Sequence, residues 1–110
     1  MTKRHESHYL EDILNPATLA VDFLSTSTRE SFEKDMLRQG ATLFQLAVIG
    51  EATKHISKEF RDKHPEIPWK KMAAMRDVLV HAYHELDLDI VWNVVSNSLP
   101  ELISHLKVLK

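Results

Sequence analysis

The sequence predicts an all-α fold, an antiparallel bundle of four to five helices, and three observations lead to it. Apolar residues recur at the three- and four-residue spacing of amphipathic helices through most of the 110 residues. Only 2 Gly and 4 Pro are present, which is few for a turn-rich all-β protein. The predicted connections are short, so consecutive helices should pack antiparallel. We therefore expect residues 1–110 to form a single domain.

The first predicted helix runs from Tyr9 to Leu24 and contains Asn15–Pro16. Proline removes a backbone hydrogen bond inside a helix, so we expect the helix to kink or restart there. A run of serines and threonines follows it. The last of them, Thr28, is a candidate N-cap for a short turn that starts at Arg29.

A longer helix is predicted from about Asp35 to Arg61. Its middle, residues 41–50, is apolar on almost every side, so it should be the buried central helix. Gly50 costs roughly 1 kcal/mol relative to alanine inside a helix, which indicates that another backbone passes close to it. The two prolines of His64–Pro68 then require a loop, because proline cannot continue a helix.

The third helical stretch opens at Trp69 and reaches about Leu86. Asp87 could cap the last helix, Leu88 to Leu109, which Pro100 could bend. We expect Trp69 and Trp92 to anchor the core rather than to stack on bases. One stripe of the last helix is apolar: Leu88, Val91, Val95, Leu102 and Leu106.

Composition places the chain among soluble cytoplasmic proteins. Cysteine is absent, which excludes disulfides and thiolate metal sites and makes a reducing cytosol the natural setting. The residues after Met1 lack an apolar signal core, and no apolar run approaches the length of about 18 residues that a membrane span needs. We therefore expect neither export nor a membrane partner.

The net charge of −2 does not suggest a general nucleic-acid coat. Cations are nevertheless concentrated in one stretch, residues 54–76, which holds seven Lys and Arg against three acidic residues. That stretch could steer a phosphate toward Arg76. The alternative, which we favour for most of these residues, is a solvated helix end.

The informative stretch is residues 75–83. On a helical wheel, Arg76, Asp77, His81 and His84 occupy the half opposite the apolar side chains. Asp77 and His81 are four residues apart, so the carboxylate could orient the imidazole. Val80 lies in the middle of this polar half, which indicates a second protein surface there. A dimer would bring two copies of Arg76 and His81 together across a two-fold axis.

These residue types suit metal-free RNA cleavage, in which a base takes the proton of the 2′-OH and that oxygen attacks the adjacent phosphorus. His81 can move the proton, and Arg76 can hold the phosphate oxygens as charge develops. Alone, this spacing of arginine and histidine arises often by chance, so the residues by themselves leave a structural role open. Glu51 is either hydrogen-bonded at a helix seam or lines the cleft near Arg76.

A metal site is the other chemistry considered. His81 and His84, with Glu85 and Asp87, have a spacing compatible with metal ligands, but no third ligand stands at a recognised spacing. We therefore expect neither a metal nor another cofactor.

The stretch from Arg76 to Tyr83 resembles the R-x4-H-x-Y motif of HepT-like proteins in the HEPN superfamily of helical ribonucleases. The similarity extends in order through residues 9–14, 49–52, 65–69, 89–92 and 99–102. It implies a HEPN-like bundle that dimerises with the two motifs facing each other and cleaves RNA without metal. Arg76 and His81 would be the catalytic pair, supported by Asp77. Asn15–Pro16 departs from the family's pattern of a continuing helix.

The resemblance also implies a bacterial toxin–antitoxin pair. A nucleotidyltransferase antitoxin of the MntA type would attach AMP to Tyr83, and the added phosphate would obstruct an RNA substrate such as tRNA or mRNA. A purely structural hydroxyl is the alternative for Tyr83. A different function also remains open, namely a non-catalytic module that binds a nucleotide or serves as the partner of a nucleotidyltransferase.

Overall fold

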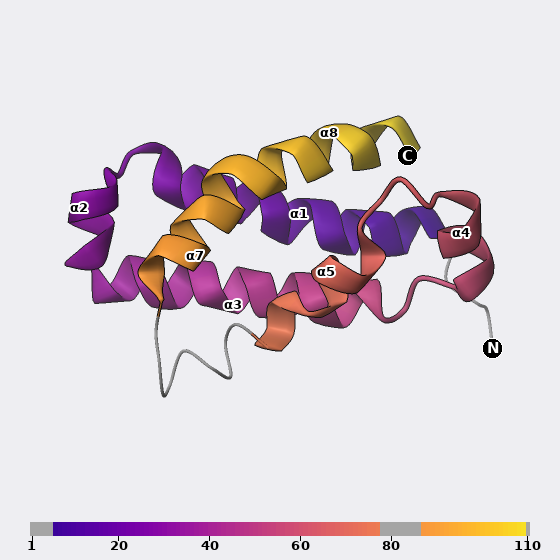
Figure 1. The fold of residues 1–110 in the computed structure, drawn as a ribbon, viewed down its shortest axis with the longest axis horizontal. Helices are drawn as coiled ribbons and strands as arrows, with labels where there is room; N and C mark the ends of the chain where they lie inside the picture. Colours follow the sequence, from indigo (N-terminus) through magenta and orange to yellow (C-terminus); the bar gives the residue numbers. More distant parts are fainter. Residues whose placement is uncertain (1–5, 78–86, 110) are drawn as a thin grey trace.

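The structure is a computed structural model that describes residues 6–77 and 87–109. These two ranges contain helices and short connections without any strand, which confirms the all-α prediction (Figure 1). None of the helices in them has the length and hydropathy needed to cross a bilayer. The elements are α1 (Glu6–Ser25), α2 (Arg29–Glu33), α3 (Met36–Thr53), α4 (Lys58–Lys63), α5 (Trp69–Ala73), α7 (Leu88–Asn93), the π-helix η1 (Val94–Ser98) and α8 (Leu99–Leu109).

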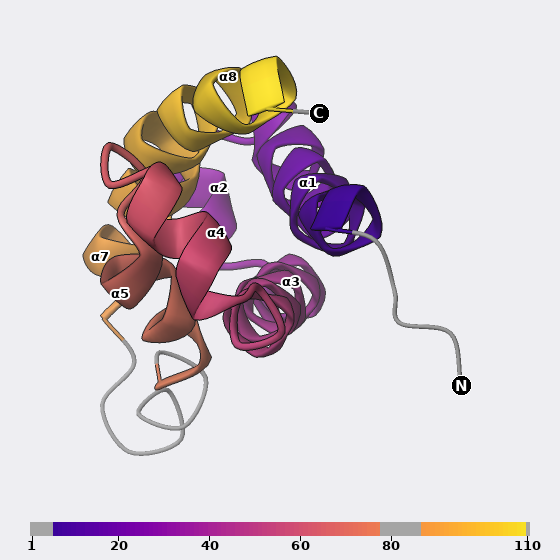
Figure 2. The same cartoon turned by 90° about the vertical axis from the view of Figure 1, so that its right-hand side faces the viewer.

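The long helices form an antiparallel bundle. α3 and α8 both pack against α1, and both run in the direction opposite to it (Figure 1). Viewed from the end, α1, α3 and α8 surround the core, and α5 lies on the side where α3 faces α7 (Figure 2). α2 closes one end of the bundle, and α4 lies at the other.

The core is made of aliphatic side chains that α1, α3 and the last helices direct inward. Phe32 from α2 and Met72 from α5 are also fully buried. Burial of each such side chain stabilises the fold by about 1.5–3 kcal/mol. Burial of these side chains is therefore the main force that holds the helices together. The predicted stripe is confirmed: Val91, Val95, Leu102 and Leu106 are buried, and Leu88 is half-buried.

Both tryptophans anchor the core, as predicted. Trp69 is 8% exposed, and its indole Nε1 donates a hydrogen bond to the carbonyl of His64 at 2.9 Å. Trp92 packs on Phe32 with 5.7 Å between the ring centroids. Trp69 thereby connects the proline-containing loop to α5.

α1 continues through Pro16 as one helix, so of the two predicted effects, a kink or a restart, the restart is wrong. The helix is packed on two sides, since Leu10, Ile13 and Ala17 are almost completely buried between its neighbours. Tertiary packing of this kind outweighs the single hydrogen bond that proline removes. At the other end of α1, the turn is as predicted, because Thr28 caps α2 in a capping box with Ser31.

The helix predicted from Asp35 to Arg61 is two helices. Asp35 is the N-cap of α3, which ends at Thr53. Ser57 then caps α4, and its hydroxyl accepts a hydrogen bond from the Phe60 N–H at 3.1 Å. A serine hydroxyl offers the backbone this alternative to helix continuation, and that signal was missed in the sequence.

In the middle of α3, residues 41–50, every residue except Phe44 is buried or half-buried, so the predicted buried helix is confirmed there with Phe44 as the exception. Leu43, Leu46 and Ile49 lie in the core. On the outside, Leu37 is 89% exposed and Phe44 is 60% exposed. The apolar surface of this helix exceeds what its own bundle can cover.

The two C-terminal helices are also interrupted. The helix predicted from Trp69 to Leu86 stops at Ala73, turns at Ala74 and is helical again over residues 75–77; the remainder lies outside the described residues. Asp87 caps α7 through the N–H groups of Asp89 and Ile90, as predicted. The π-helix η1 comes directly before Pro100 in α8, whose missing N–H disturbs a regular α-helical ladder.

Candidate functional site

Arg76 is held against α3 at the level of the backbone. A methyl group on Gly50 would lie 2.7 Å from the backbone nitrogen of Arg76, 2.9 Å from its Cβ and 3.0 Å from the carbonyl oxygen of Ala73. Contacts this short are not tolerated, so only glycine permits the approach. The prediction that another backbone passes close to Gly50 is confirmed, and that backbone is the start of the motif.

Glu51, the next residue of α3, holds the side chain of Arg76. The Glu51 Oε1 lies 2.8 Å from Nη1 of Arg76, and both side chains are 51% exposed. Lys54 Nζ is 3.6 Å from the same carboxylate oxygen. Glu51 is thus paired with Arg76 across the seam between α3 and the chain that follows α5, an arrangement that fits both of the alternatives predicted for it.

Of the other predicted site residues, the structure describes only Asp77. It is exposed, and its backbone N–H donates to the carbonyl of Ala74 at 2.9 Å. His81, Tyr83, Val80 and His84 lie outside the described residues, and so does Glu85. Their roles therefore stay predictions.

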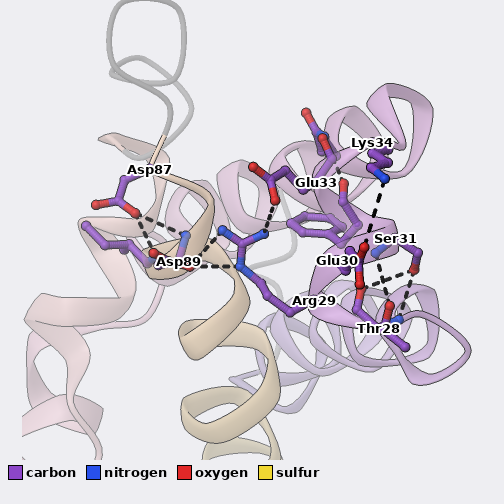
Figure 3. Close-up of polar contacts among 11 residues, drawn as sticks. Thr28, Arg29, Glu30, Ser31, Glu33, Lys34, Asp87 and Asp89 are labelled. Atoms are coloured by element: carbon purple, nitrogen blue, oxygen red, sulfur yellow. Dashed lines mark hydrogen bonds and ion pairs between the residues drawn. The ribbon is translucent and has the colours of Figure 1, made fainter.

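The chain that follows the motif segment (residues 76–83) is fixed to α2 where α7 begins (Figure 3). Both Nε and Nη2 of Arg29 contact one carboxylate oxygen of Asp89, at 2.8 and 2.7 Å. Arg29 Nη1 also lies 3.8 Å from Glu33. Residues 78–86 therefore lie in the sequence between two anchored positions. Arg76 is held by Glu51 of α3, and Asp89 is held by Arg29 of α2.

The basic stretch 54–76 divides into two parts. On α4, Lys58 pairs with Asp62 at 3.0 Å and Lys63 with Glu59 at 3.6 Å, each four residues apart and exposed. These cations form the solvated helix end that we favoured. Arg76 is different, because its partner Glu51 comes from another helix.

Within the described ranges, no group of three or more His, Cys, Asp or Glu side chains gathers as metal ligands would. This absence covers residues 6–77 and 87–109 alone, because His81 and His84 lie outside the described residues. The chemistry available to the described site is that of a guanidinium on a fixed backbone. Such a group suits an anionic ligand, and a phosphate fits its fork of N–H donors.

Comparison with known proteins adds a family to this geometry. A family model described as "Ribonuclease HepT-like" matches residues 13–109. "Probable ribonuclease HepT" of Thermococcus cleftensis is 40% identical over 108 residues, which cover 98% of each chain. "Putative RNase MJ0127" of Methanocaldococcus jannaschii is 37% identical over 107 residues, covering 97% of this chain and 88% of that protein.

A third relative is similar over most of its own length. "Putative RNase TTE0752" of Caldanaerobacter subterraneus subsp. tengcongensis is 38% identical over 99 residues, covering 90% of this chain and 88% of its own. No solved structure matches the chain. The matched range includes Gly50, Glu51 and the whole motif segment.

Proposed function

Because the chain belongs to the HepT-like ribonuclease family, we propose that it is an endoribonuclease that cleaves RNA without a metal ion. The observation that carries the proposal is the placement of Arg76. Its backbone is fixed against Gly50 and its guanidinium is half exposed beside Glu51. A cation held in this way is suited to bind a phosphodiester from solvent.

In the proposed reaction, His81 takes the proton of a ribose 2′-OH. The 2′ oxygen then bonds to the adjacent phosphorus while the bond from phosphorus to the 5′ oxygen breaks. The products are a 2′,3′-cyclic phosphate and a 5′-hydroxyl, which takes up a proton as it leaves. Arg76 stabilises the charge on the phosphate oxygens in the transition state, and Asp77 supports His81.

We also propose that the active form is a homodimer. Leu37 and Phe44 are seven residues apart and exposed on α3, and Glu51 follows at the same interval. Residues with this spacing lie almost on one line along a helix. A second copy covering this apolar line would therefore pack next to Arg76, in agreement with the dimer predicted from Val80.

Light scattering tests the dimer. We expect Phe44→Glu and Val80→Glu to give monomers that no longer cleave RNA, because each places a charge in an apolar interface. Val108→Glu is the matched control, since Val108 is 82% exposed on α8 and lies outside the proposed interface. Dimers that persist in both interface variants would contradict the proposal.

The wider role that we propose is that of a toxin neutralised by a nucleotidyltransferase antitoxin, which transfers AMP to Tyr83. An anionic group two residues beyond His81 would repel the RNA backbone. Co-expression with a nucleotidyltransferase encoded next to this protein should add the mass of one or more AMP units to the peptide containing Tyr83. An unmodified peptide would contradict this role.

The deciding experiment expresses wild type, Arg76→Ala and His81→Ala in bacteria and assays each purified protein on total RNA in EDTA. We expect growth arrest and cleavage from wild type alone. Equal toxicity from all three, or RNA left intact by the wild type, would remove the ribonuclease and favour a non-catalytic partner of a nucleotidyltransferase.

A further inference from the structure

The only charged partner that another helix offers Arg76 in the described structure is Glu51. The two side chains meet at 2.8 Å through Glu51 Oε1 and Arg76 Nη1. We propose that Glu51 is a positioning residue, which holds the guanidinium of Arg76 in the orientation that binds the scissile phosphate. This inference rests on the proposed ribonuclease function and adds a residue outside the motif to its site.

The backbone contact at Gly50 makes this ion pair more than a surface contact between two flexible side chains. Gly50 fixes the backbone nitrogen and Cβ of Arg76 against α3, and Glu51 extends from the next residue of the same helix. Both ends of the pair therefore start from fixed positions. The separation of the two residues is therefore set by helix packing, whereas the pair itself, being half exposed, contributes little to stability.

The geometry of the contact leaves the guanidinium able to bind an anion. Glu51 engages Nη1, whereas bidentate binding of a phosphate can use the edge formed by Nε and Nη2. A carboxylate on one side of the planar group would thus set its orientation, and the RNA phosphate would approach from the other side.

The negative charge of Glu51 also has a cost for RNA affinity. A carboxylate close to the phosphate site repels the RNA backbone, so removing it should favour binding while harming orientation. The expected result is a split between the kinetic constants: kcat falls when Glu51 is neutralised, and KM stays level or decreases. A residue needed only for folding would not produce this pattern.

The test compares the full chain with its Glu51→Gln variant on a short RNA that contains one mapped cleavage site. We expect kcat to fall about tenfold and KM not to rise. Glu59→Gln is the matched control, because Glu59 is also an exposed carboxylate paired with a lysine but belongs to α4. It should change neither constant by more than about twofold.

A second readout does not depend on activity. Phenylglyoxal modifies accessible arginines, and peptide mass spectrometry gives the rate at each one. Glu51→Gln should raise the rate at Arg76 several-fold and leave Arg29, which is held by Asp89, unchanged.

The outcomes separate the two proposals. Wild-type kcat in Glu51→Gln, with RNA still cleaved, overturns the positioning role alone. A lower kcat without any change in Arg76 reactivity also overturns it, because Glu51 would then act by another route. A wild-type chain that leaves RNA intact overturns both the positioning role and the ribonuclease function.

Discussion

Two arginines hold the chain before and after the motif segment, and their side chains are bound in different ways. Arg76 is the first residue of that segment, and Arg29 of α2 holds Asp89, which follows it. Arg29 contacts Asp89 through two of its nitrogens, at 2.7 and 2.8 Å, and it is 33% exposed. Arg76 contacts Glu51 through Nη1 at 2.8 Å and is 51% exposed. Both connect segments far apart in the sequence, yet only Arg76 lies in the stretch that resembles the R-x4-H-x-Y motif.

We propose that this difference separates an arginine that holds the fold, Arg29, from one that binds the RNA phosphate, Arg76. A guanidinium that gives several donors to carboxylates of its own protein is committed to holding the fold. One that is oriented by a single carboxylate atom and remains half in solvent keeps donors with which to bind a phosphate. The predictions below test whether this difference governs activity and stability.

The largest effect is expected from Arg76→Lys. Lysine keeps the positive charge but loses the planar fork that binds phosphate in two places. We expect kcat for RNA cleavage to fall roughly a hundredfold, with the thermal unfolding midpoint close to that of wild type. Stopped assays on a defined RNA measure kcat, and circular dichroism measures the thermal unfolding midpoint. Nearly full activity would mean that charge alone suffices and that the orientation given by Glu51 is irrelevant.

A methyl group at Gly50 should push Arg76 away from α3. We expect Gly50→Ala to destabilise the protein by about 1–3 kcal/mol, because the new Cβ meets backbone atoms that cannot move aside cheaply. RNA cleavage should fall as well, since Arg76 and Glu51 would lose their register. Urea unfolding gives the free energy of unfolding.

Gly40→Ala is the matched control in the same helix. A Cβ at Gly40 has nothing within 4 Å in the single chain, so in the Phe44→Glu background, which removes the proposed dimer interface, the higher helix propensity of alanine should stabilise the protein by roughly 0.5–1 kcal/mol. The two substitutions are chemically identical and should have opposite signs. Stabilisation by Gly50→Ala would show that the close approach of Arg76 does not exist in solution.

Arg29→Ala tests the structural side of the comparison. It removes the contact between α2 and α7, and we expect a loss of roughly 1 kcal/mol in the free energy of unfolding, since the pair is partly exposed. The rate of RNA cleavage per folded molecule should stay at the wild-type level. A strong loss of activity at full stability would instead give Arg29 a role in the chemistry.

The smallest effect concerns another structural arginine, Arg38. Its backbone N–H and then its side chain donate hydrogen bonds to Asp35, which lowers the pKa of that carboxyl below its ordinary 3.8. A lowered pKa in the folded state stabilises the protein above the ordinary value, and this stabilisation disappears as the pH falls through the lowered one.

The measurement is urea unfolding of wild type and Asp35→Asn, at neutral pH and in steps below 3.8. Wild type should be the more stable at neutral pH, and the difference should vanish in acid. A difference that is independent of pH would show that the charge of Asp35 contributes nothing.

Much of the fold follows from local signals in the sequence. The caps Thr28 and Asp87 and the apolar stripe of the last helix were all predicted. The breaks at Ser57 and Ala74 were not, because apolar periodicity continues across both. Pro16 was given too much weight, since the energy of packing α1 between two helices cannot be read from its own residues.

The site, like the fold, has one part that the sequence predicted and one part that only the structure shows. Gly50 predicted a close backbone because glycine is costly in a helix, and the structure supplied Arg76 as that backbone. A position near Arg76 was one of the two alternatives predicted for Glu51, but no local signal could decide between them or predict the ion pair. The two are 25 positions apart, and only the packing of the chain after α5 against α3 brings them together.

Single-turnover cleavage of one RNA in EDTA by Arg76→Ala and Arg29→Ala, each normalised to folded protein, tests the central claim most directly. Each variant loses one guanidinium group. Arg76 begins the motif segment, and Arg29 holds Asp89, which follows that segment. We predict that Arg29→Ala cleaves at the wild-type rate and that Arg76→Ala is slower by at least about a hundredfold. Equal rates in the two variants would contradict the assignment of Arg76 to the chemistry.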